Sequence, residues 1–145
     1  MRTMRHDGGC HCGAIEISYE SEVAPEATEV RACQCSFCRK HASRAVSDPA
    51  GKVTITLHDV AAVRRYRFGL GTADYYLCGN CGVYVAAVMP DGERHYAVAI
   101  INAFKEAAAF TRVPLPSDYS AEDEAGRRQR RRERWTPTEI VIAES

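Results

Sequence analysis

The 145-residue sequence predicts a mainly β fold with an α-helix near its C-terminus. Three observations support this prediction. Apolar and polar residues alternate in several short segments, as they do in a strand with one buried face. Turn signals separate these segments roughly every eight to twelve residues, a spacing typical of all-β proteins. A stretch near the C-terminus instead has acidic residues first and arginines last, an order that favours a helix because it complements the helix dipole.

Six segments have the alternation or the composition of strands. In the first, Ile15, Ile17 and Tyr19 alternate with polar residues. The fourth and fifth flank the sequence CGNCG, which predicts a hairpin, and the sequence PDG at residues 90–92 signals a turn before the sixth. In chain order the predicted strands are residues 15–20, 52–58, 63–68, 72–77, 82–89 and 93–101.

The last third of the chain has a different pattern. Residues 102–110 predict one or two helical turns, and residues 113–119 predict a loop. Ser120 is the predicted N-cap of the C-terminal helix. Residues 138–143 predict a short edge strand or an ordered tail. No repeat and no low-complexity linker divides the sequence, so we expect a single domain over residues 1–145.

Composition argues against several classes of protein. The formal net charge is zero, which gives the whole molecule no electrostatic attraction to nucleic acid or membrane. The longest apolar runs are too short to span a bilayer. The polar N-terminal sequence MRTMRHDGG lacks the apolar core of a signal peptide, so we expect a cytoplasmic protein. In that compartment the seven cysteines are expected to be reduced thiols or metal ligands rather than disulfides.

Four of the cysteines form two short motifs in opposite halves of the sequence. Cys10 and Cys12 lie in GGCHCG, where an extended chain would place both side chains on one face. Cys78 and Cys81 form a C-x-x-C turn bounded by Gly79 and Gly82. Together they predict a tetrahedral Cys₄ zinc site that joins the N-terminal strand to the central hairpin. The alternative is four small buried apolar residues or redox thiols.

The other three cysteines, Cys33, Cys35 and Cys38, lie in CQCSFCRK. Their C-x-C-x-x-C spacing allows one loop to surround a single ion. Three protein ligands with an open fourth position are the pattern of a catalytic zinc, since water or substrate can occupy the gap. Alternatively, His41 is near enough in sequence to close the shell as a Cys₃His structural site. The spacing leaves both interpretations open.

The three motifs in this order resemble the glutathione-dependent formaldehyde-activating enzyme family, which includes the centromere protein V type. They are Gly9-Cys10-His11-Cys12-Gly13, Cys33-Gln34-Cys35-Ser36-Phe37-Cys38-Arg39-Lys40 and Cys78-Gly79-Asn80-Cys81-Gly82, and the resemblance runs from about Gly9 to Asn102. It implies a β-tent of antiparallel sheets built around two zinc ions per chain. It also implies that Cys10, Cys12, Cys78 and Cys81 hold a structural zinc, and that Cys33, Cys35 and Cys38 hold a catalytic zinc with an open position.

The reaction that the resemblance implies joins glutathione to formaldehyde as S-hydroxymethylglutathione, a carbon–sulfur lyase reaction run in reverse. Three thiolates on a divalent ion leave such a site at net −1, which acidifies bound water less than three neutral ligands do. A thiol is better suited to the open position, where it would ionise and become a positioned nucleophile. We therefore expect a small-molecule thiol, such as glutathione, and an aldehyde as partners.

Two rival functions use other features of the sequence. The arginine-rich segment 127–134 would let a non-enzymatic zinc module contact protein or nucleic acid. The three middle cysteines would also suit thiol redox chemistry. We expect instead that the arginines form a solvated helix face paired with nearby acidic residues, and we do not expect nucleic-acid binding. Arg39, Lys40 and Arg44 either hold the carboxylates of a peptide thiol or only compensate the charge of the thiolates.

Overall fold

The computed structural model describes residues 2–143, and over this range the prediction of a mainly β fold with a C-terminal helix is confirmed. The α-helices are α1 (Ser36–His41) and α2 (Glu124–Arg134). The strands are β1 (Met4–Gly9), β2 (Ile15–Ser21), β3 (Arg31–Cys33), β4 (Ala45–Val46), β5 (Lys52–Leu57), β6 (Val63–Tyr66), β7 (Asp74–Cys78), β8 (Tyr84–Asp91), β9 (Arg94–Ile100), β10 (Leu115–Ser117) and β11 (Thr136–Ile142). The predicted helical turns in residues 102–110 are two short 3₁₀ helices, Ile101–Ala103 and Ala107–Ala109.

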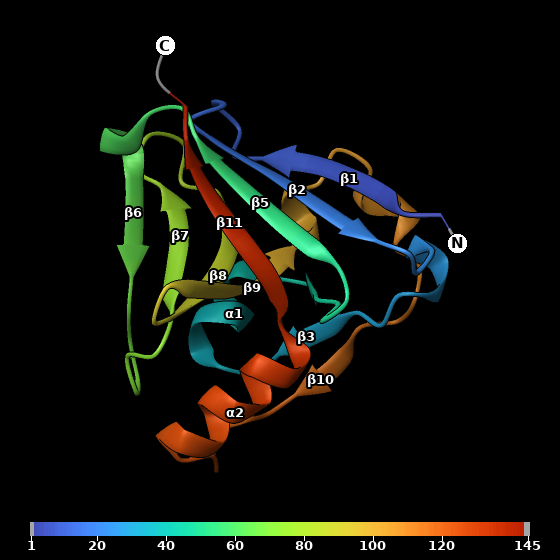
Figure 1. The fold of residues 1–145 in the computed structure, drawn as a ribbon, viewed down its shortest axis with the longest axis vertical. Coiled ribbons are helices and arrows are strands. Elements are labelled where there is room, and N and C mark those ends of the chain that lie inside the picture. The colour runs from blue at the N-terminus through green and yellow to red at the C-terminus, as the bar shows by residue number, and fades with distance from the viewer. Residues whose placement is uncertain (1, 144–145) are drawn as a thin grey trace.

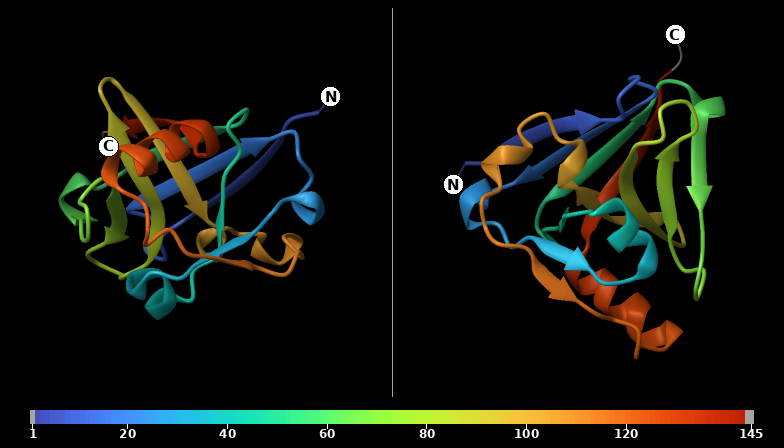
Figure 2. Two further views of the ribbon diagram at one scale, coloured as in Figure 1. Left: turned by 90° about the horizontal axis from the view of Figure 1, so that it is seen from below. Right: turned by 180° about the vertical axis from the view of Figure 1, so that it is seen from behind.

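The strands pair into one hydrogen-bonded network with two slopes, which are inclined to each other as in a tent (Figures 1 and 2). One slope has the order β1-β2-β5-β11, and the other has the order β6-β7-β8. The slopes are joined through β9, which pairs with β11 and with β8. Apart from β5–β11 and β3–β10, which are parallel, the pairs are antiparallel. From β9 the network continues through β4 and β3 to β10.

Pairing of β2 with β5 shows why the alternating segments become strands. Their apolar residues lie opposite one another in antiparallel register and are at most 1% exposed. Cross-strand pairs of this kind stabilise a sheet because both partners leave water together. The pairs are Ile15–Leu57, Ile17–Ile55 and Tyr19–Val53.

Strand β1 is not apparent from the sequence MRHDGG, which is polar and ends in two glycines. It nevertheless pairs with β2 along its whole length, from Met4–Ser21 to Gly9–Glu16. A Cβ atom at Gly8 would lie 2.2 Å from the carbonyl oxygen of Ala103, so only glycine permits this close approach of the two backbones. The glycine therefore serves tertiary packing, which a strand propensity does not detect.

The turn predicted at residues 90–92 lies two residues further on. Pro90 and Asp91 continue β8 and pair with His95 and Arg94, so Gly92 and Glu93 form the hairpin loop. Gly92 has φ +62°, as a two-residue loop of this kind requires. The register is set by apolar residues of both strands, and it overrides the local turn preference of Pro90.

Strand β11 is longer and more central than the predicted edge strand or tail over residues 138–143. It begins at Thr136, pairs in parallel with β5, and pairs through its first residues with β9. Ile140 lies opposite Ile55, so the C-terminal segment is built into the first slope. The parallel partner of β11 is more than 80 residues away in sequence. The sequence of β11 alone therefore does not show whether it is an inner strand or an edge strand.

Residues 113–119, predicted to be a loop, contain β10. This strand runs parallel to β3 and places Ser117 opposite Cys33. The carbonyl oxygen of Ser117 accepts a hydrogen bond of 2.9 Å from the backbone N–H of Gln34. Through this pairing the chain that leads into α2 is held beside the middle cysteine motif. Figure 1 shows α1 and α2 in the lower half of the molecule.

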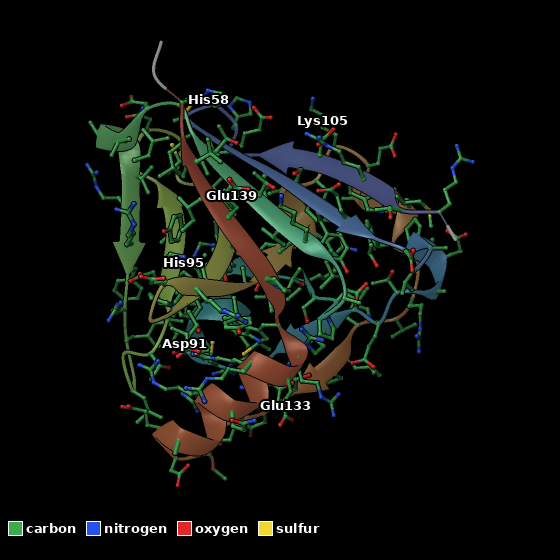
Figure 3. All side chains as sticks on the ribbon, viewed as in Figure 1. His58, Asp91, His95, Lys105, Glu133 and Glu139 are labelled. Carbon is green, nitrogen blue, oxygen red and sulfur yellow. The ribbon has the colours of Figure 1, made fainter. Side chains whose placement is uncertain are left out.

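Helix α2 begins after Asp123 rather than after the predicted N-cap Ser120. The Asp123 carboxylate accepts a 2.7 Å hydrogen bond from the backbone N–H of Gly126, which satisfies one of the free donors of the first turn. An ion pair between Arg132 and Asp91 joins the helix to the β8–β9 hairpin; Asp91 is labelled in Figure 3. No helix among residues 2–143 is long and apolar enough to cross a membrane.

We expect Asp123→Ala to lower the free energy of unfolding by about 1 kcal/mol, because it removes the capping acceptor. Ser120→Ala is the matched control and should change it by less than about 0.5 kcal/mol. Urea denaturation of the two variants measures both values. A larger loss for Ser120→Ala than for Asp123→Ala would restore Ser120 as the cap.

Candidate metal centres

The structure places the seven cysteines in the two groups that their spacing predicts. The first group joins Cys10 and Cys12, in the turn between β1 and β2, to Cys78 and Cys81 around the β7–β8 turn. Their four sulfur atoms lie within 4.8 Å of one another. Cys78 is buried, Cys10 and Cys81 are half-buried, and Cys12 is exposed. The four thiols belong to strand ends that are far apart in sequence.

The spacing of these sulfur atoms fits a tetrahedral zinc site. Zinc–sulfur bonds of about 2.3 Å in a tetrahedron put the sulfur atoms about 3.8 Å apart. The Sγ of Cys12 lies 3.7 Å from that of Cys10 and 3.5 Å from that of Cys78. Four soft thiolate ligands are also the set that zinc prefers in closed structural sites. The residues present therefore fit the metal.

Local backbone geometry explains how the four thiols converge. Cys10 and Cys12 lie in a turn, not on extended chain as predicted, and the Sγ of Cys10 accepts a 3.2 Å hydrogen bond from the Ile15 backbone N–H. In the second motif Gly82 has φ +82°, a conformation that favours glycine. Its N–H donates to the Cys78 carbonyl oxygen at 2.8 Å, which closes the C-x-x-C turn.

The second group consists of Cys33, Cys35 and Cys38, whose sulfur atoms also lie within 4.8 Å of one another. Cys33 ends β3, Cys35 is the N-cap of α1, and Cys38 lies in the first turn of that helix. The Sγ of Cys35 accepts a 3.3 Å hydrogen bond from the backbone N–H of Cys38. The strand end and the helix start thus direct three thiols toward one point. No carboxylate or imidazole of residues 2–143 joins this group.

His41, the alternative fourth ligand, lies at the last position of α1. Its ring packs on Phe37 at 4.5 Å and on Tyr84 at 5.3 Å between centroids. Phe37 also stacks on Phe68 and meets Tyr75 edge to face. In this conformation the His41 ring belongs to an aromatic cluster and stays outside the three-thiol group. In this conformation His41 therefore does not supply a fourth ligand to the second cysteine group.

Hydrogen bonding inside the second group favours ionisation of one thiol. A hydrogen bond from Cys38 lowers the pKa of Cys33 to about 5, although burial opposes this change. The pKa of Cys38 is raised correspondingly, chiefly because its proton is held by Cys33 and because the thiol is buried. A thiolate is therefore present near neutral pH, and a thiolate is the form that binds metal.

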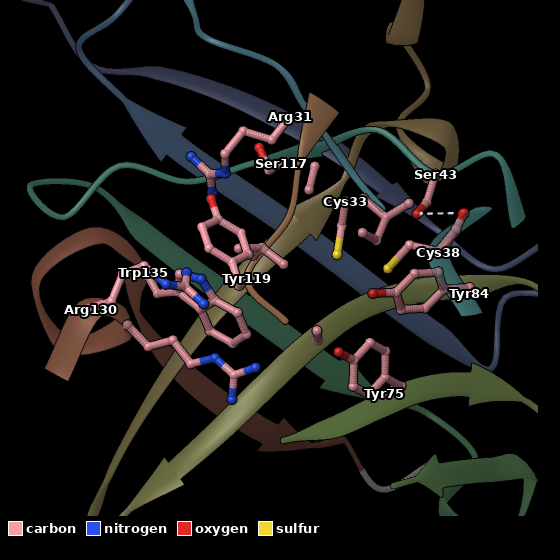
Figure 4. A pocket seen from close by; sticks show the side chains of 15 residues that line it. Arg31, Cys33, Cys38, Ser43, Tyr75, Tyr84, Ser117, Tyr119, Arg130 and Trp135 are labelled. Carbon is pink, nitrogen blue, oxygen red and sulfur yellow. Dashed lines mark hydrogen bonds between the residues drawn. The ribbon is translucent and has the colours of Figure 1, made fainter. Parts of the chain in front are cut away.

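Beside this second group lies a cavity of about 520 Å³, a volume that includes its open mouth. In Figure 4 the sulfur atoms of Cys33 and Cys38 point into the same space as the hydroxyl groups of Tyr75 and Tyr84. Apolar walls come from β8 and β9, including Ala87 and Ile100, and an apolar lining with a few polar groups is typical of small-molecule sites. Two thiols of the second group thus share a cavity with two phenol hydroxyl groups.

Tyr75 and Tyr84 bring neutral hydrogen-bond donors to the cavity. Burial raises the pKa of both phenols, and the negative charge of the second cysteine group raises them further. Both therefore stay protonated at neutral pH. The sequence does not identify Tyr75 as a cavity residue, because alternation along β7 does not show that this face of the strand borders a cavity.

Helix α2 forms the opposite wall of the cavity, which corrects the prediction of a solvated arginine face. Four of its arginines do pair with acidic residues: Arg127 and Arg130 with Glu122, Arg128 with Glu124, and Arg132 with Asp91. Arg131, however, is only 5% exposed. Arg130 and Arg131 line the cavity together with Trp135, the residue that follows the helix.

Basic residues of the cysteine motif lie elsewhere. Arg39 and Arg44 line a groove of about 670 Å³ on which Cys33 and Cys38 also border. Cys33, Cys38 and Ser43 border both the cavity and this groove, but Arg39 and Arg44 line the groove and do not line the cavity. The arginines that line the cavity therefore come from α2 and from β3, where Arg31 lies. No motif in the sequence identifies Arg131.

Comparisons with known proteins agree with this architecture. A solved crystal structure of a Rhodobacter sphaeroides protein is 26% identical in sequence and has a TM-score of 0.55; the match covers 75% of this chain and 98% of that one. A sequence model described as glutathione-dependent formaldehyde-activating enzyme matches residues 5–113, which include all seven cysteines. Because this match spans most of the sequence, the chain belongs to the glutathione-dependent formaldehyde-activating enzyme family.

Proposed function

We propose that the protein is a zinc-dependent carbon–sulfur lyase that joins a small thiol to an aldehyde and cleaves the adduct again. Glutathione and formaldehyde are the first substrates to test, because they are the ones for which the family is described. The proposal rests on one contrast between the two thiol groups. The second group has three ligands, two of which, Cys33 and Cys38, line a cavity, whereas the other four cysteines are enough for a closed site.

We assign one zinc ion to each group, as the ligand types favour. Cys10, Cys12, Cys78 and Cys81 would hold the structural ion. Cys33, Cys35 and Cys38 would hold the second ion, which when bound supplies an open position at which a substrate thiol is ionised. We also propose that the reaction takes place in the cytoplasm, where thiols stay reduced.

The reaction needs no oxidant or reductant. The substrate sulfur attacks the carbonyl carbon, a sulfur–carbon bond forms, and the carbonyl π bond breaks. The proton that the thiol loses ends on the oxygen of the new hydroxyl group. Negative charge develops on this oxygen during attack, and a hydroxyl donor nearby stabilises it. Tyr75 and Tyr84 are protonated donors in the cavity and are suited to this role.

The proposal is tested by the rate at which ¹³C-formaldehyde exchanges with its glutathione adduct, measured by exchange NMR. The zinc-loaded protein should raise this rate above the spontaneous value. Tyr84→Phe should lower the protein-dependent rate about tenfold to a hundredfold, because it removes one donor to the developing oxyanion.

Tyr76→Phe is the matched control, since Tyr76 lies beside Tyr75 in β7 but is not in the cavity lining, and its hydroxyl accepts from Arg65 instead. This variant should keep the wild-type rate. Exchange at the spontaneous rate in the presence of zinc-loaded wild type, with glutathione and with smaller thiols, would exclude the lyase. A loss of activity in Tyr76→Phe as large as in Tyr84→Phe would remove the role of the cavity hydroxyl.

A further inference from the structure

We propose that Arg131 binds the carboxylate of the substrate and makes the cavity selective for small thiols that carry one. The inference rests on the proposed function for the reaction, and on the structure of the α2 wall for the selectivity. It assigns a recognition role to a helix outside residues 5–113, the part of the chain that matches the family.

Arg131 has an unused pair of hydrogen-bond donors although it is almost entirely buried. Its side chain donates from Nη1 to the hydroxyl of Thr72 at 2.8 Å, and Thr72 is itself 4% exposed. The Nε atom is buried and has no partner among residues 2–143. The same residues provide no acceptor for Nη2. The Nε–Nη2 edge of a guanidinium is one that binds a carboxylate with two parallel hydrogen bonds.

Two neighbours hold the guanidinium in place without using this edge. The ring of Trp135 lies under the guanidinium, with 4.5 Å between the Cζ atom and the ring centroid. Thr72 fixes the Nη1 end. Stacking and a single hydrogen bond pre-organise the planar group, so a ligand would lose little conformational entropy of Arg131 on binding.

Of the three arginines that line the cavity, Arg131 is the buried one without a counterion, whereas Arg31 is half-buried and donates to the hydroxyl of Ser47. Arg130 is paired with Glu122 through hydrogen bonds of 2.7 and 3.0 Å and lies over the ring of Tyr119. No aspartate or glutamate lines the cavity, and none of residues 2–143 forms an ion pair with Arg131. Burying a cation in this way is costly unless an anion balances it.

The thiolates of the second cysteine group are a competing counterion, since a zinc ion with three thiolates has a net charge of −1. Compensation of that charge depends on distance and sign alone. It would not need a planar group held by Trp135 and Thr72 with an intact bidentate edge. The geometry therefore favours recognition of a ligand carboxylate, and a lysine at this position distinguishes the two roles.

The test compares 3-mercaptopropionate with 3-mercaptopropan-1-ol, each with formaldehyde. We expect the wild type to have the higher kcat/KM for the carboxylate. Arg131→Lys keeps the charge but lacks the planar donor edge, and should lower this preference about tenfold to a hundredfold by raising KM for the carboxylate alone. Arg132→Gln, on the same helix but not in the cavity lining, should leave the preference unchanged.

Calorimetric binding of the two thiols to zinc-loaded protein, without aldehyde, separates the inference from the proposed function. Tighter binding of 3-mercaptopropionate that is lost in Arg131→Lys supports the inference even if the protein accelerates no aldehyde reaction. Equal binding and equal turnover of both thiols by the wild type overturn the inference while the lyase function stands. Unchanged preference in Arg131→Lys would identify Arg131 as a charge compensator and also overturn it. Arg131→Gln with a wild-type melting temperature should abolish the preference altogether.

Discussion

Replacing Cys81 with serine is expected to abolish cooperative unfolding or to lower the melting temperature by at least about 10 °C. The first cysteine group joins the β1–β2 turn to the β7–β8 turn, and Cys12 and Cys78 are 66 residues apart in sequence. Zinc bound by four thiolates contributes about 10 kcal/mol or more to the folding of small domains. That is comparable to the entire stability of a typical domain, about 5–15 kcal/mol.

The link between distant strand ends adds a second reason for this large effect. Without the fourth ligand, the N-terminal strands and the central hairpin lose a connection that restricts the unfolded chain, and closing a long loop has an entropy cost that the metal otherwise offsets. Thermal unfolding of zinc-loaded protein, followed by circular dichroism, measures the change. A Cys81→Ser variant that melts within a few degrees of wild type would show that this group is not the structural site.

Cys35→Ser is expected to abolish exchange of the formaldehyde adduct while the protein stays folded. The second cysteine group lies within six consecutive residues, so its metal closes almost no chain and contributes little to the fold. Serine also keeps the local structure, since Cys35 is the N-cap of α1 and serine is among the best N-cap residues. The substitution therefore removes one of the three metal ligands and leaves the helix cap in place.

Adduct exchange should therefore fall to the spontaneous rate, with a melting temperature within about 3 °C of wild type, a shift of roughly 1 kcal/mol at this size. Exchange NMR and circular dichroism on the same sample give both quantities, and Cys81→Ser is the comparison that should unfold. If Cys35→Ser collapses as Cys81→Ser does, the second group is structural. If it folds and retains the full rate, the chemistry lies elsewhere.

The cysteine groups were predictable because metal ligands obey local spacing rules. C-x-x-C and C-x-C-x-x-C motifs bring thiols together whatever surrounds them, and the structure places all seven sulfur atoms in the expected groups. The alternating strands were predictable for a similar reason, since residues such as Ile15 and Ile17 must face one side. Both signals depend on a few neighbouring residues.

Features that depend on distant partners were not predictable in the same way. The position of β11 between β5 and β9, and of β10 beside β3, follows from pairings across most of the sequence. Those pairings place α2 over the cavity, and so decide that Arg131 is buried while Arg132 on the same helix meets Asp91. A run of arginines has no periodic apolar signal that would identify its inner face.

The number of zinc ions bound to each chain tests the account most directly, because it depends on two unlike metal centres. Native mass spectrometry of wild type and Cys35→Ser, with zinc confirmed by elemental analysis, measures it. We predict two zinc ions per chain in the wild type and one in the folded Cys35→Ser variant. One zinc ion in the wild type, or two retained in Cys35→Ser, would contradict the assignment of Cys33, Cys35 and Cys38 to a separate site.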